Sequence, residues 1–384
     1  MGVDKAIGIA DLRSMALRRL PRLIADWMEG GAEDELGVRR DAQQFGRYRL
    51  VPRYLVDVGT VDTSTTLFGR RYANPFGIAP TGCPGFFRPG GDMMLARAAV
   101  QADVPYIMSG SSTASIEEAA AVAPQHAWYQ IYAARDDAIT MDFVRRSRDA
   151  GLPGLVVTVD LPSAAKRERD LRNGFSMPFR YSVGTVLDGL LHPAWTAAWF
   201  ASGGLPYLSN WTPYAPPGSD AKAVAAFSDT QYYPQFDWTN LERIRAAWPR
   251  TLVVKGILAH EDARRAQAIG VDGIVVSTHG GRQGDRLPSA LEVLPAILEA
   301  APGLTVIVDG GIRRGADVVT ALCLGAHFVL LGRAVLYGLS AGGQAGVSRA
   351  LAILDDEMQV VMRQIGRTRV ADLTRDVVLD AGFV

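Results

Sequence analysis

The sequence predicts an α/β fold, a (β/α)8 TIM barrel with an N-terminal helical lid and a long insertion after the fourth strand. Two observations support this class. About eight short apolar runs alternate with helical patterns along the chain. Many of these runs end in glycine or in a polar residue able to do chemistry, which is where such barrels carry their sites. We expect one domain over residues 1–384, with the barrel at about 74–340.

The composition narrows the class of protein. Hydrophobic residues make up 48% and charged residues 21% of the chain, as in ordinary globular proteins. The formal net charge is +0, so no excess of basic residues points to nucleic acid. The two cysteines, Cys83 and Cys323, argue against a disulfide framework or a metal site and fit the cytoplasm. We expect no signal peptide and no spanning helix, which would need an apolar run of roughly 20 residues.

The two ends of the chain are predicted to be helical. Asp11 is placed to cap a helix that passes through Trp27 and ends near Gly30. Residues 35–72 are mixed and charged, and we expect them to cover one end of the core. Residues 343–373 are predicted as helices that support the barrel.

Between these ends lies the repeated strand–helix pattern. The expected strands are 76–80, 106–109, 127–131, 155–160, 252–255, 274–277, 306–309 and 328–332. The expected helices include 92–102, 115–123, 137–150, 261–269, 289–300 and 315–324. A doubly wound sheet is the competing interpretation, but it does not naturally explain eight repeats with polar residues at each strand end.

One connection is far longer than a loop and a helix require. About ninety residues separate Asp160 from Thr251, and the part at about 177–227 is apolar and rich in aromatic residues. Leu187, Leu190 and Trp195 indicate a short amphipathic helix. The insertion fits an interfacial membrane patch, since aromatic rings settle at the headgroup level, and it fits a lid or a subunit interface equally well.

The polar residues after the strands form a candidate site, because all strand carboxyl ends share one face of a barrel. They are Pro80, Thr81, Gly82, Ser109, Gln130, Tyr132, Thr158, Asp160, Lys255, Ser277, His279, Arg282, Asp309, Gly310, Gly311, Arg313, Gly332 and Arg333. The stretch Ser277–Asp285 carries a histidine, an arginine and an aspartate; a polar loop with a satisfied histidine is the alternative.

Four further interpretations follow from these residues. The glycines and arginines at 309–313 and 332–333 predict a phosphate site, unless they are two turns with solvated arginines. Lys255 ends a buried strand, where it would stabilise negative charge on a bound ring. Asp160 and His279 are predicted to pair across the barrel mouth, while Gln130, Thr158 and Ser109 suit the edge of a heterocycle.

At this point the motifs resemble a known family. Ser277–Gln283, Thr158–Asp160, Lys166–Asp170, Asp309–Arg313 and Leu331–Arg333 are similar to motifs of the FMN-dependent α-hydroxy acid oxidase and dehydrogenase family. The resemblance runs from about Leu20 to Leu373. Over Met28–Glu35, Arg167–Leu171 and Leu336–Leu339 it is strongest to members that oxidise (S)-mandelate.

The resemblance implies a role for each candidate residue. His279 is the active-site base and Asp160 its partner, Arg282, Arg167 and Tyr132 hold the substrate carboxylate, and Lys255 stabilises the reduced flavin. Trp27 is expected among the substrate-binding residues. The FMN-binding residues are expected to be Pro80, Thr81, Gly82, Ser109, Gln130, Thr158, Lys255, Ser277, Asp309, Gly310, Gly311, Arg313, Gly332 and Arg333.

Some positions depart from the family's pattern. Trp27 stands in place of a tyrosine, so one hydroxyl contact to the substrate is missing. Thr278 replaces an asparagine and Gly284 a leucine, which we expect to loosen the loop that carries His279. Ser111 leaves space for an aromatic substrate, and Gly82 occupies a position where oxidases of the family tend to carry alanine.

The implied function is FMN-dependent oxidation of an (S)-2-hydroxy acid, (S)-mandelate or a related aryl acid, with electrons passed to a quinone. The resemblance also implies a homotetramer and peripheral attachment to the inner face of the cytoplasmic membrane. The alternatives are a peroxide-producing oxidase, an L-lactate dehydrogenase, a flavin-binding protein without turnover, and a flavin-free isomerase of a phosphorylated ligand.

Overall fold

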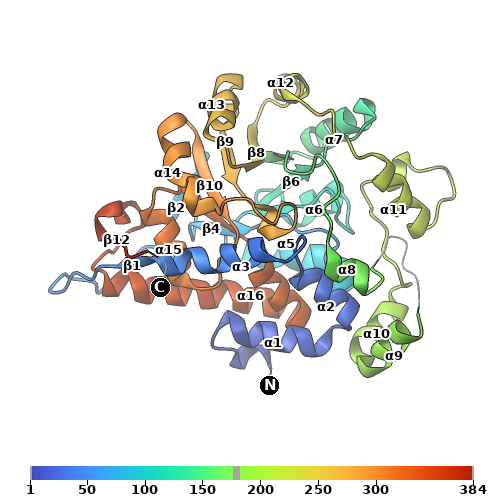
Figure 1. The fold of residues 1–384 in the computed structure, drawn as a ribbon, viewed down its shortest axis with the longest axis horizontal. Coiled ribbons are helices and arrows are strands. Elements are labelled where there is room, and N and C mark those ends of the chain that lie inside the picture. The colour runs from blue at the N-terminus through green and yellow to red at the C-terminus, as the bar shows by residue number, and fades with distance from the viewer. Residues whose placement is uncertain (1, 176–181, 383–384) are drawn as a thin grey trace.

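The computed structural model describes residues 2–175 and 182–382. At its centre is a closed barrel of parallel strands in the order β10-β11-β4-β5-β6-β7-β8-β9 (Figure 1). The strands are β4 (Phe76–Ile78), β5 (Tyr106–Met108), β6 (Ala127–Ile131), β7 (Gly154–Thr158), β8 (Thr251–Ile257), β9 (Gly273–Val276), β10 (Thr305–Asp309) and β11 (Phe328–Leu331). The predicted barrel is confirmed, and the doubly wound alternative is wrong because such a sheet stays open.

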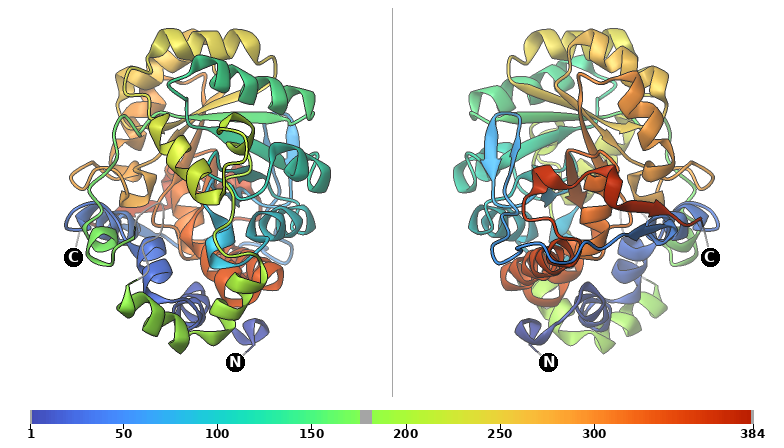
Figure 2. Two further views of the ribbon diagram at one scale, coloured as in Figure 1. Left: turned by 90° about the vertical axis from the view of Figure 1, so that its right-hand side faces the viewer. Right: turned by 90° about the vertical axis from the view of Figure 1, so that its left-hand side faces the viewer.

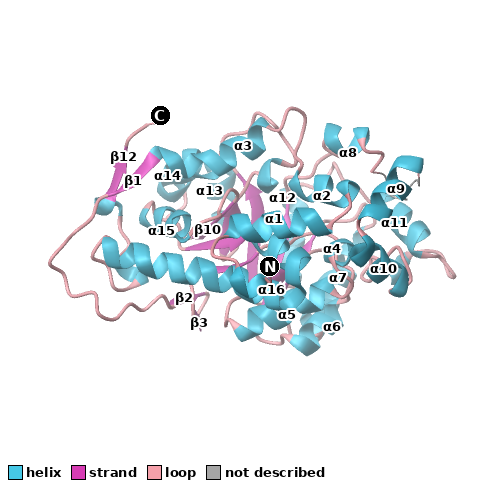
Figure 3. Ribbon diagram, turned by 90° about the horizontal axis from the view of Figure 1, so that it is seen from below, coloured by secondary structure: helices cyan, strands magenta, loops and turns pink. Residues whose placement is uncertain are grey.

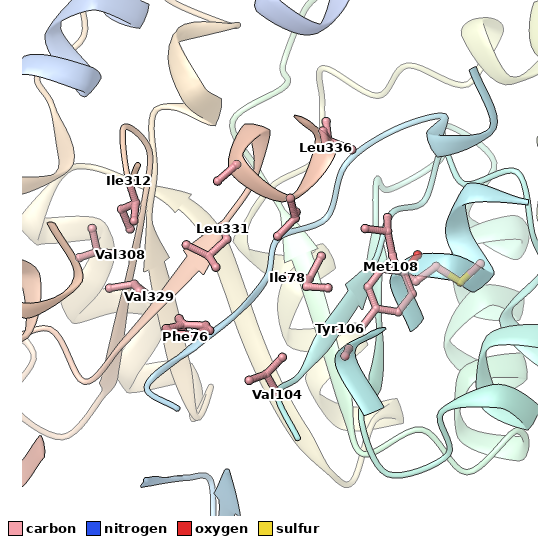
Figure 4. Packing of buried hydrophobic residues seen from close by; sticks show 14 of the residues in the cluster. Phe76, Ile78, Val104, Tyr106, Met108, Val308, Ile312, Val329, Leu331 and Leu336 are labelled. Carbon is pink, nitrogen blue, oxygen red and sulfur yellow. The ribbon is translucent and has the colours of Figure 1, made fainter. Parts of the chain in front are cut away.

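The strands are apolar throughout because both faces of the barrel wall are buried. Phe76, Ile78 and Leu331 belong to the cluster between the strands and the outer helices (Figure 4). Val156, Val253 and neighbours from other strands form a second cluster. The parallel register also determines which residues are neighbours at the mouth of the barrel: Thr158 on β7 pairs with Lys255 on β8.

The helices between the strands agree with the predicted ranges to within one residue at each end. They are α5 (Gly91–Gln101), α6 (Ile116–Val122), α7 (Asp137–Asp149), α13 (His260–Ile269), α14 (Ala290–Ala300) and α15 (Gly315–Cys323). A short helix, α4 (Pro84–Phe87), precedes α5. Side-chain caps explain part of this agreement: the Ser115 side chain accepts from the Glu118 amide at the start of α6.

The N-terminal helix is divided in two, which the prediction missed. The helices are α1 (Ile9–Arg19) and α2 (Arg22–Glu29), and Pro21 between them ends the first. Asp11 caps α1 from inside its first turn, where its Oδ2 accepts from the amides of Ile7 and Gly8 at 2.8 and 3.1 Å.

Residues 35–72 serve both ends of the barrel rather than one. Helix α3 (Leu36–Gln43) lies against the 3-10 helix η4 (His279–Gly281) at the mouth. The hairpin of β2 (Thr65–Leu67) and β3 (Arg70–Tyr72) covers the opposite end. There Phe68 packs beside Trp128 at the start of β6, with ring centres 5.6 Å apart. A further strand, β1 (Tyr48–Leu50), follows the short 3-10 helix η2 (Gln44–Arg47).

The insertion after β7 is largely helical. Its elements are α8 (Glu168–Arg172), α9 (Val183–Leu191), α10 (Pro193–Ala201), η3 (Thr212–Tyr214), α11 (Ala221–Thr230) and α12 (Trp238–Ala247). The single amphipathic helix expected here is two helices, broken at His192–Pro193, and residues 177–181 of the predicted insertion lie outside the described residues. Helices α9 and α10 lie near α1 and α2 (Figure 1 and Figure 2), where the Arg22 amide donates to Asp188 at 2.5 Å.

The C-terminal part is helical for less of its length than predicted. Helix α16 (Arg333–Gln364) packs against α1, α5 and α15 (Figure 3) and bends at Gly343, whose φ is 61°. Two 3-10 turns follow α16. The last strand, β12 (Val378–Asp380), then pairs antiparallel with β1. Among the described residues, no helix is long and apolar enough to cross a membrane.

Candidate active site

The carboxyl ends of the strands surround a cavity of about 400 Å³. Its walls include the predicted residues Trp27, Pro80, Thr81, Gly82, Tyr132, Thr158, Arg167, Lys255, His279, Arg282, Asp309, Gly310, Gly311, Arg313, Gly332 and Arg333. The other predicted residues lie behind this wall. Ser109 and Gln130 are buried and hydrogen-bonded to each other at 3.3 Å.

The predicted pair of His279 and Asp160 is formed. His279 follows β9 with a left-handed φ of 55°, and its amide donates to Ser277 Oγ at 3.0 Å. Its Nδ1 lies 3.0 and 3.2 Å from the two carboxylate oxygens of Asp160. This contact leaves Nε2 free to accept a proton.

The electrostatics of this pair suit a base. Burial lowers the pKa of His279, and Lys255 lowers it further, although Asp160 opposes both. Burial would raise the pKa of Asp160, but His279 and Lys255 outweigh it and the pKa is lowered. Near neutral pH the imidazole is therefore neutral and stands beside a carboxylate that stabilises its protonated form.

Two guanidinium groups occupy the next part of the wall. Arg282 Nη1 donates to the carbonyl oxygens of Trp27 and Gly30 at 2.6 and 2.8 Å, and Arg167 Nε donates to the Arg282 carbonyl at 3.2 Å. Burial lowers the pKa of Arg282 well below its usual value, and Arg167 adds to this effect. Neither arginine has an ion pair within the described part of the chain. Two cations this close favour binding of an anion such as a carboxylate.

Tyr132 adds a neutral hydrogen-bond donor, its hydroxyl, to the part of the wall that these arginines form. Its ring centre lies 6.4 Å from that of His279. Burial raises the pKa of Tyr132, so its hydroxyl stays protonated.

Lys255 remains charged although it is buried. Its Nζ donates to Ser277 Oγ at 2.8 Å and lies 3.3 Å from Asp309 Oδ2. Burial opposes the charge, but Asp309 and Asp160 outweigh it and raise the pKa of Lys255. A positive charge is thus held at the floor of the cavity.

Several buried polar atoms around the cavity lack a hydrogen-bond partner in the described protein. They include Thr81 Oγ1, Gln130 Nε2, Thr158 Oγ1 and Asp309 Oδ1. A buried polar atom without a partner costs roughly 1–3 kcal/mol, so these atoms indicate a bound polar molecule. Donors and acceptors spread over neighbouring strand ends suit the edge of a heterocycle.

One end of the cavity is suited to a phosphate. Gly310 and Gly311 have φ of 95° and 77°, and a Cβ at Gly311 would lie 1.7 Å from the Asp41 carbonyl oxygen. The N-terminus of α16 opens here at Gly332. Arg313 lies over the Tyr337 ring at 5.6 Å.

Arg333 is held differently from what the sequence indicated. Its guanidinium donates to the carbonyl oxygens of Met28, Gly280 and Gly30 at 2.9, 2.8 and 2.8 Å. The side chain therefore fastens α2 and η4 to α16. It contributes positive charge to the phosphate end, while its N–H groups are committed to the protein.

The loop that carries His279 is tied down rather than loosened. Thr278 Oγ1 donates to Asp41 Oδ2 at 2.6 Å and accepts from the Gly281 amide at 3.3 Å. The Asp285 carboxylate has a structural contact instead of a place in the cavity wall. It accepts hydrogen bonds from the amides of Asp34 and Gly37 at 3.2 and 2.8 Å, at the start of α3. It stabilises the helix that presses on the loop.

Sequence reasoning missed Asp41 and several residues of the cavity wall. Asp41 is a lone carboxylate in a charged helix, and its burial is visible only when α3 packs on η4. Phe86, Phe87 and Phe175 form an aromatic wall, and Tyr232 reaches the cavity from beyond α11. The pair Phe86–Phe87, which follows the first barrel strand, could have indicated an apolar wall of the site. No pattern in the sequence placed Tyr232 at the cavity.

Comparison with known proteins identifies the class. A family model described as FMN-dependent dehydrogenase matches residues 16–380. The chain belongs to the FMN-dependent dehydrogenase family, and the predictions of a flavin enzyme and of FMN as its cofactor are confirmed. The orphaned donors at the strand ends and the glycine-lined phosphate end fit this cofactor.

Particular relatives cover nearly the whole chain. The (S)-mandelate dehydrogenase of Pseudomonas putida is 40% identical over 374 residues, which span 97% of this chain and 94% of the relative. The L-lactate dehydrogenase of Caulobacter vibrioides is 39% identical over 96% of this chain and 97% of its own length. A crystal structure of the monotopic membrane protein (S)-mandelate dehydrogenase matches with a TM-score of 0.94 at 39% identity, covering 98% of this chain and 100% of the other.

Proposed function

We propose that this enzyme oxidises an (S)-2-hydroxy acid, (S)-mandelate or a related aryl acid, to the 2-oxo acid. The observation that carries this proposal is the neutral His279, paired with Asp160 beside Arg167 and Arg282, which have no carboxylate partner among the described residues. A 2-hydroxy acid offers what this arrangement takes up: a carboxylate for the arginines and, next to it, a proton for the base.

In the proposed reaction the protein binds, orients and deprotonates the substrate. Arg167 and Arg282 hold the carboxylate, with a hydrogen bond from Tyr132. His279 accepts a substrate proton at Nε2, and Asp160 stabilises the imidazolium that results. FMN, when bound, would be the oxidant and would take up the two electrons together with the second of the two hydrogens that the substrate loses. Lys255 places positive charge where the reduced flavin would carry its negative charge.

The proposed cofactor site combines three regions of the chain. Pro80, Thr81, Gly82, Ser109, Gln130, Thr158, Lys255, Ser277 and Asp309 would hold the ring system. Gly310, Gly311, Arg313, Gly332 and Arg333 would form the phosphate end. The unpartnered atoms of Thr81, Gln130 and Thr158 support this placement.

An aryl side chain is favoured by the apolar part of the cavity. The ring centre of Trp27 lies 5.4–5.8 Å from those of Phe86, Phe87 and Phe175. The ring centres of Phe86 and Phe175 are 6.4 Å apart. This wall would cover a phenyl group and exclude water. Lactate is the second candidate, because it has the same reacting groups and several relatives are L-lactate dehydrogenases.

We propose a quinone or another membrane acceptor for the electrons. Helices α9 and α10 expose Val183, Leu187, Leu190, Leu191 and Phe200, each more than half accessible. Their only Asp, Glu, Lys or Arg residue is Asp188. This apolar face favours peripheral attachment to a membrane, and the inner face of the cytoplasmic membrane is proposed because the family resemblance implies it.

The membrane proposal has a direct test. Leu187→Asp/Leu190→Asp should move the protein from the membrane pellet to the supernatant, while Val360→Asp, at an exposed apolar site on α16, should not. Equal sedimentation of both variants with vesicles would contradict the proposal. Light scattering on the soluble variant would test the expected homotetramer.

Oxidase activity is the second candidate function, because a mandelate oxidase structure matches with a TM-score of 0.82 at 38% identity. Gly82 favours the dehydrogenase, because oxidases of the family that the sequence resembles tend to carry alanine at this position. A Cβ at Gly82 would lie in ordinary contact with Ser111 Cβ, at 3.6 Å.

The experiment that tests the function is anaerobic bleaching of the flavin band by (S)-mandelate, (R)-mandelate and (S)-lactate, followed by air. Rapid bleaching by (S)-mandelate with slow recovery supports the proposal. Rapid recovery with peroxide makes the protein an oxidase. A flavin that no 2-hydroxy acid bleaches refutes turnover of this substrate class.

A further inference from the structure

We propose that Tyr232 is a substrate-binding residue, whose hydroxyl donates a hydrogen bond to the carboxylate of the bound acid. The inference rests on the proposed 2-hydroxy acid oxidation and extends it to the insertion. It assigns to the segment after α11 the hydroxyl contact that Trp27 does not make.

The Trp27 side chain packs against aromatic rings and against Arg282. The Trp27 ring is stacked on Phe87 and Phe175, with ring centres 5.4 and 5.6 Å apart and planes at 28° and 12°. Its face lies 5.2 Å from the guanidinium carbon of Arg282, and its carbonyl oxygen accepts from the same side chain. Trp27 therefore orients Arg282 by a cation–π contact and has no hydroxyl to offer.

Tyr232 lies in the cavity wall close to the same anion site. It interacts electrostatically with Arg167, and Tyr132 interacts with Tyr232, Arg167 and Arg282. The two tyrosines thus share Arg167, one of the two arginines that face the proposed carboxylate. Tyr132 directly follows β6 and Tyr232 belongs to the insertion, so the anion site is approached from two sides.

The backbone next to Tyr232 is held in place. The Arg135 amide donates to the Gln231 carbonyl oxygen at 3.0 Å, and the Asp136 amide donates to Gln231 Oε1 at 3.2 Å. Both donors belong to the loop that follows β6. The segment is thereby fastened to the loop that follows β6 and begins with Tyr132, which limits the entropy lost when Tyr232 binds a ligand.

The Tyr232 hydroxyl is available as a donor. Burial raises the pKa of Tyr232 and Asp229 adds to this rise, so the group stays protonated near neutral pH. Within residues 2–175 and 182–382 its hydroxyl has no hydrogen-bond partner. An anion between Tyr232 and Arg167 would supply one.

The test compares two tyrosines of the insertion, one in the cavity wall and one outside it. In FMN-loaded enzyme, the dissociation constant of phenylglyoxylate is read from the change in flavin absorption, and KM and kcat for (S)-mandelate are measured. Tyr232→Phe should raise the dissociation constant and KM roughly tenfold to a hundredfold, with a smaller change in kcat, because hydrogen bonds to charged groups are the strong ones. Tyr207→Phe, at an exposed tyrosine of the insertion that is not among the residues lining the cavity, should leave all three unchanged.

Three further measurements separate a carboxylate contact from general packing. Binding of acetophenone, which lacks the carboxylate, should be the same in Tyr232→Phe and the parent enzyme. Trp27→Tyr combined with Tyr232→Phe should recover part of the lost phenylglyoxylate affinity. Tyr232→Leu also lacks the hydroxyl and should weaken phenylglyoxylate binding at least as much.

Unchanged phenylglyoxylate binding in Tyr232→Phe, or an equal loss for acetophenone, overturns the inference while the proposed function stands. A parent enzyme whose flavin no 2-hydroxy acid bleaches overturns both. The two failures are distinguished because the first is seen only in the variant and the second already in the parent.

Discussion

Replacing Asp160 by asparagine tests the proposed base most directly. The substitution keeps the shape of the side chain and an oxygen that can face His279 Nδ1, but removes the charge. In the parent protein, Nδ1 lies 3.0 Å from Asp160 Oδ1, and both groups are largely buried. We expect slower flavin reduction with FMN binding retained.

The size of the effect follows from this distance. For two unit charges about 4 Å apart, an effective dielectric constant of about 20 gives roughly 4 kcal/mol of attraction between imidazolium and carboxylate. Measured hydrogen bonds to charged groups contribute about 1.5–3 kcal/mol, and the asparagine oxygen retains part of the contact. A loss near the upper end of that range, about 3 kcal/mol, slows reduction roughly a hundredfold.

The direction in which the pH profile of flavin reduction shifts is an independent test of the same pair. The base works when neutral, so the rate falls as pH drops through the pKa of His279. Asp160 raises that pKa against the effect of burial, so Asp160→Asn should move the acid limb to lower pH. Stopped-flow reduction of bound FMN by (S)-mandelate over pH 5–9 measures both effects.

A matched control is available at the other end of the barrel. Asp103 Oδ1 lies 2.9 Å from His126 Nε2, and both residues precede strands. Asp103→Asn removes the same kind of pair and should leave the reduction rate and its pH profile unchanged. An unchanged rate in Asp160→Asn, or an acid limb displaced to higher pH, refutes the assignment of His279 and Asp160.

Three other substitutions extend these expectations. Lys255→Met should move the acid limb of flavin reduction to higher pH, opposite to Asp160→Asn, because Lys255 lowers the pKa of His279; an unmoved limb contradicts this. Burial raises the pKa of Asp41 from 3.8 to about 6, so the folded state holds this proton more tightly and stability falls as pH rises from about 4 to 6. Asp41→Asn should remove that fall, up to about 3 kcal/mol in urea unfolding of the apoprotein; identical pH profiles contradict it. Gly311→Ala places a Cβ 1.7 Å from the Asp41 carbonyl oxygen and should abolish FMN retention, measured as flavin per protein.

The sequence by itself determined the barrel and the residues at its mouth. Buried parallel strands are continuous apolar runs, and helices show their own period and caps, so each element could be located from its own residues. Parallel strands in a barrel share one carboxyl-end face, so the same runs also placed Lys255, His279 and Arg313 at the mouth. These features depend on local patterns and on a rule of the fold.

Only the tertiary structure decided which groups meet and what each side chain does. Asp160 and His279 are separated by 119 positions, and Asp41 and Thr278 by 237. Their contacts depend on barrel closure and on α3 packing over η4. The same packing turned Arg333 toward backbone carbonyl oxygens and brought Tyr232 from the insertion to the cavity wall. Hydrogen bonds and pKa shifts act over a few ångströms, and such distances between remote segments exist only once the chain has folded.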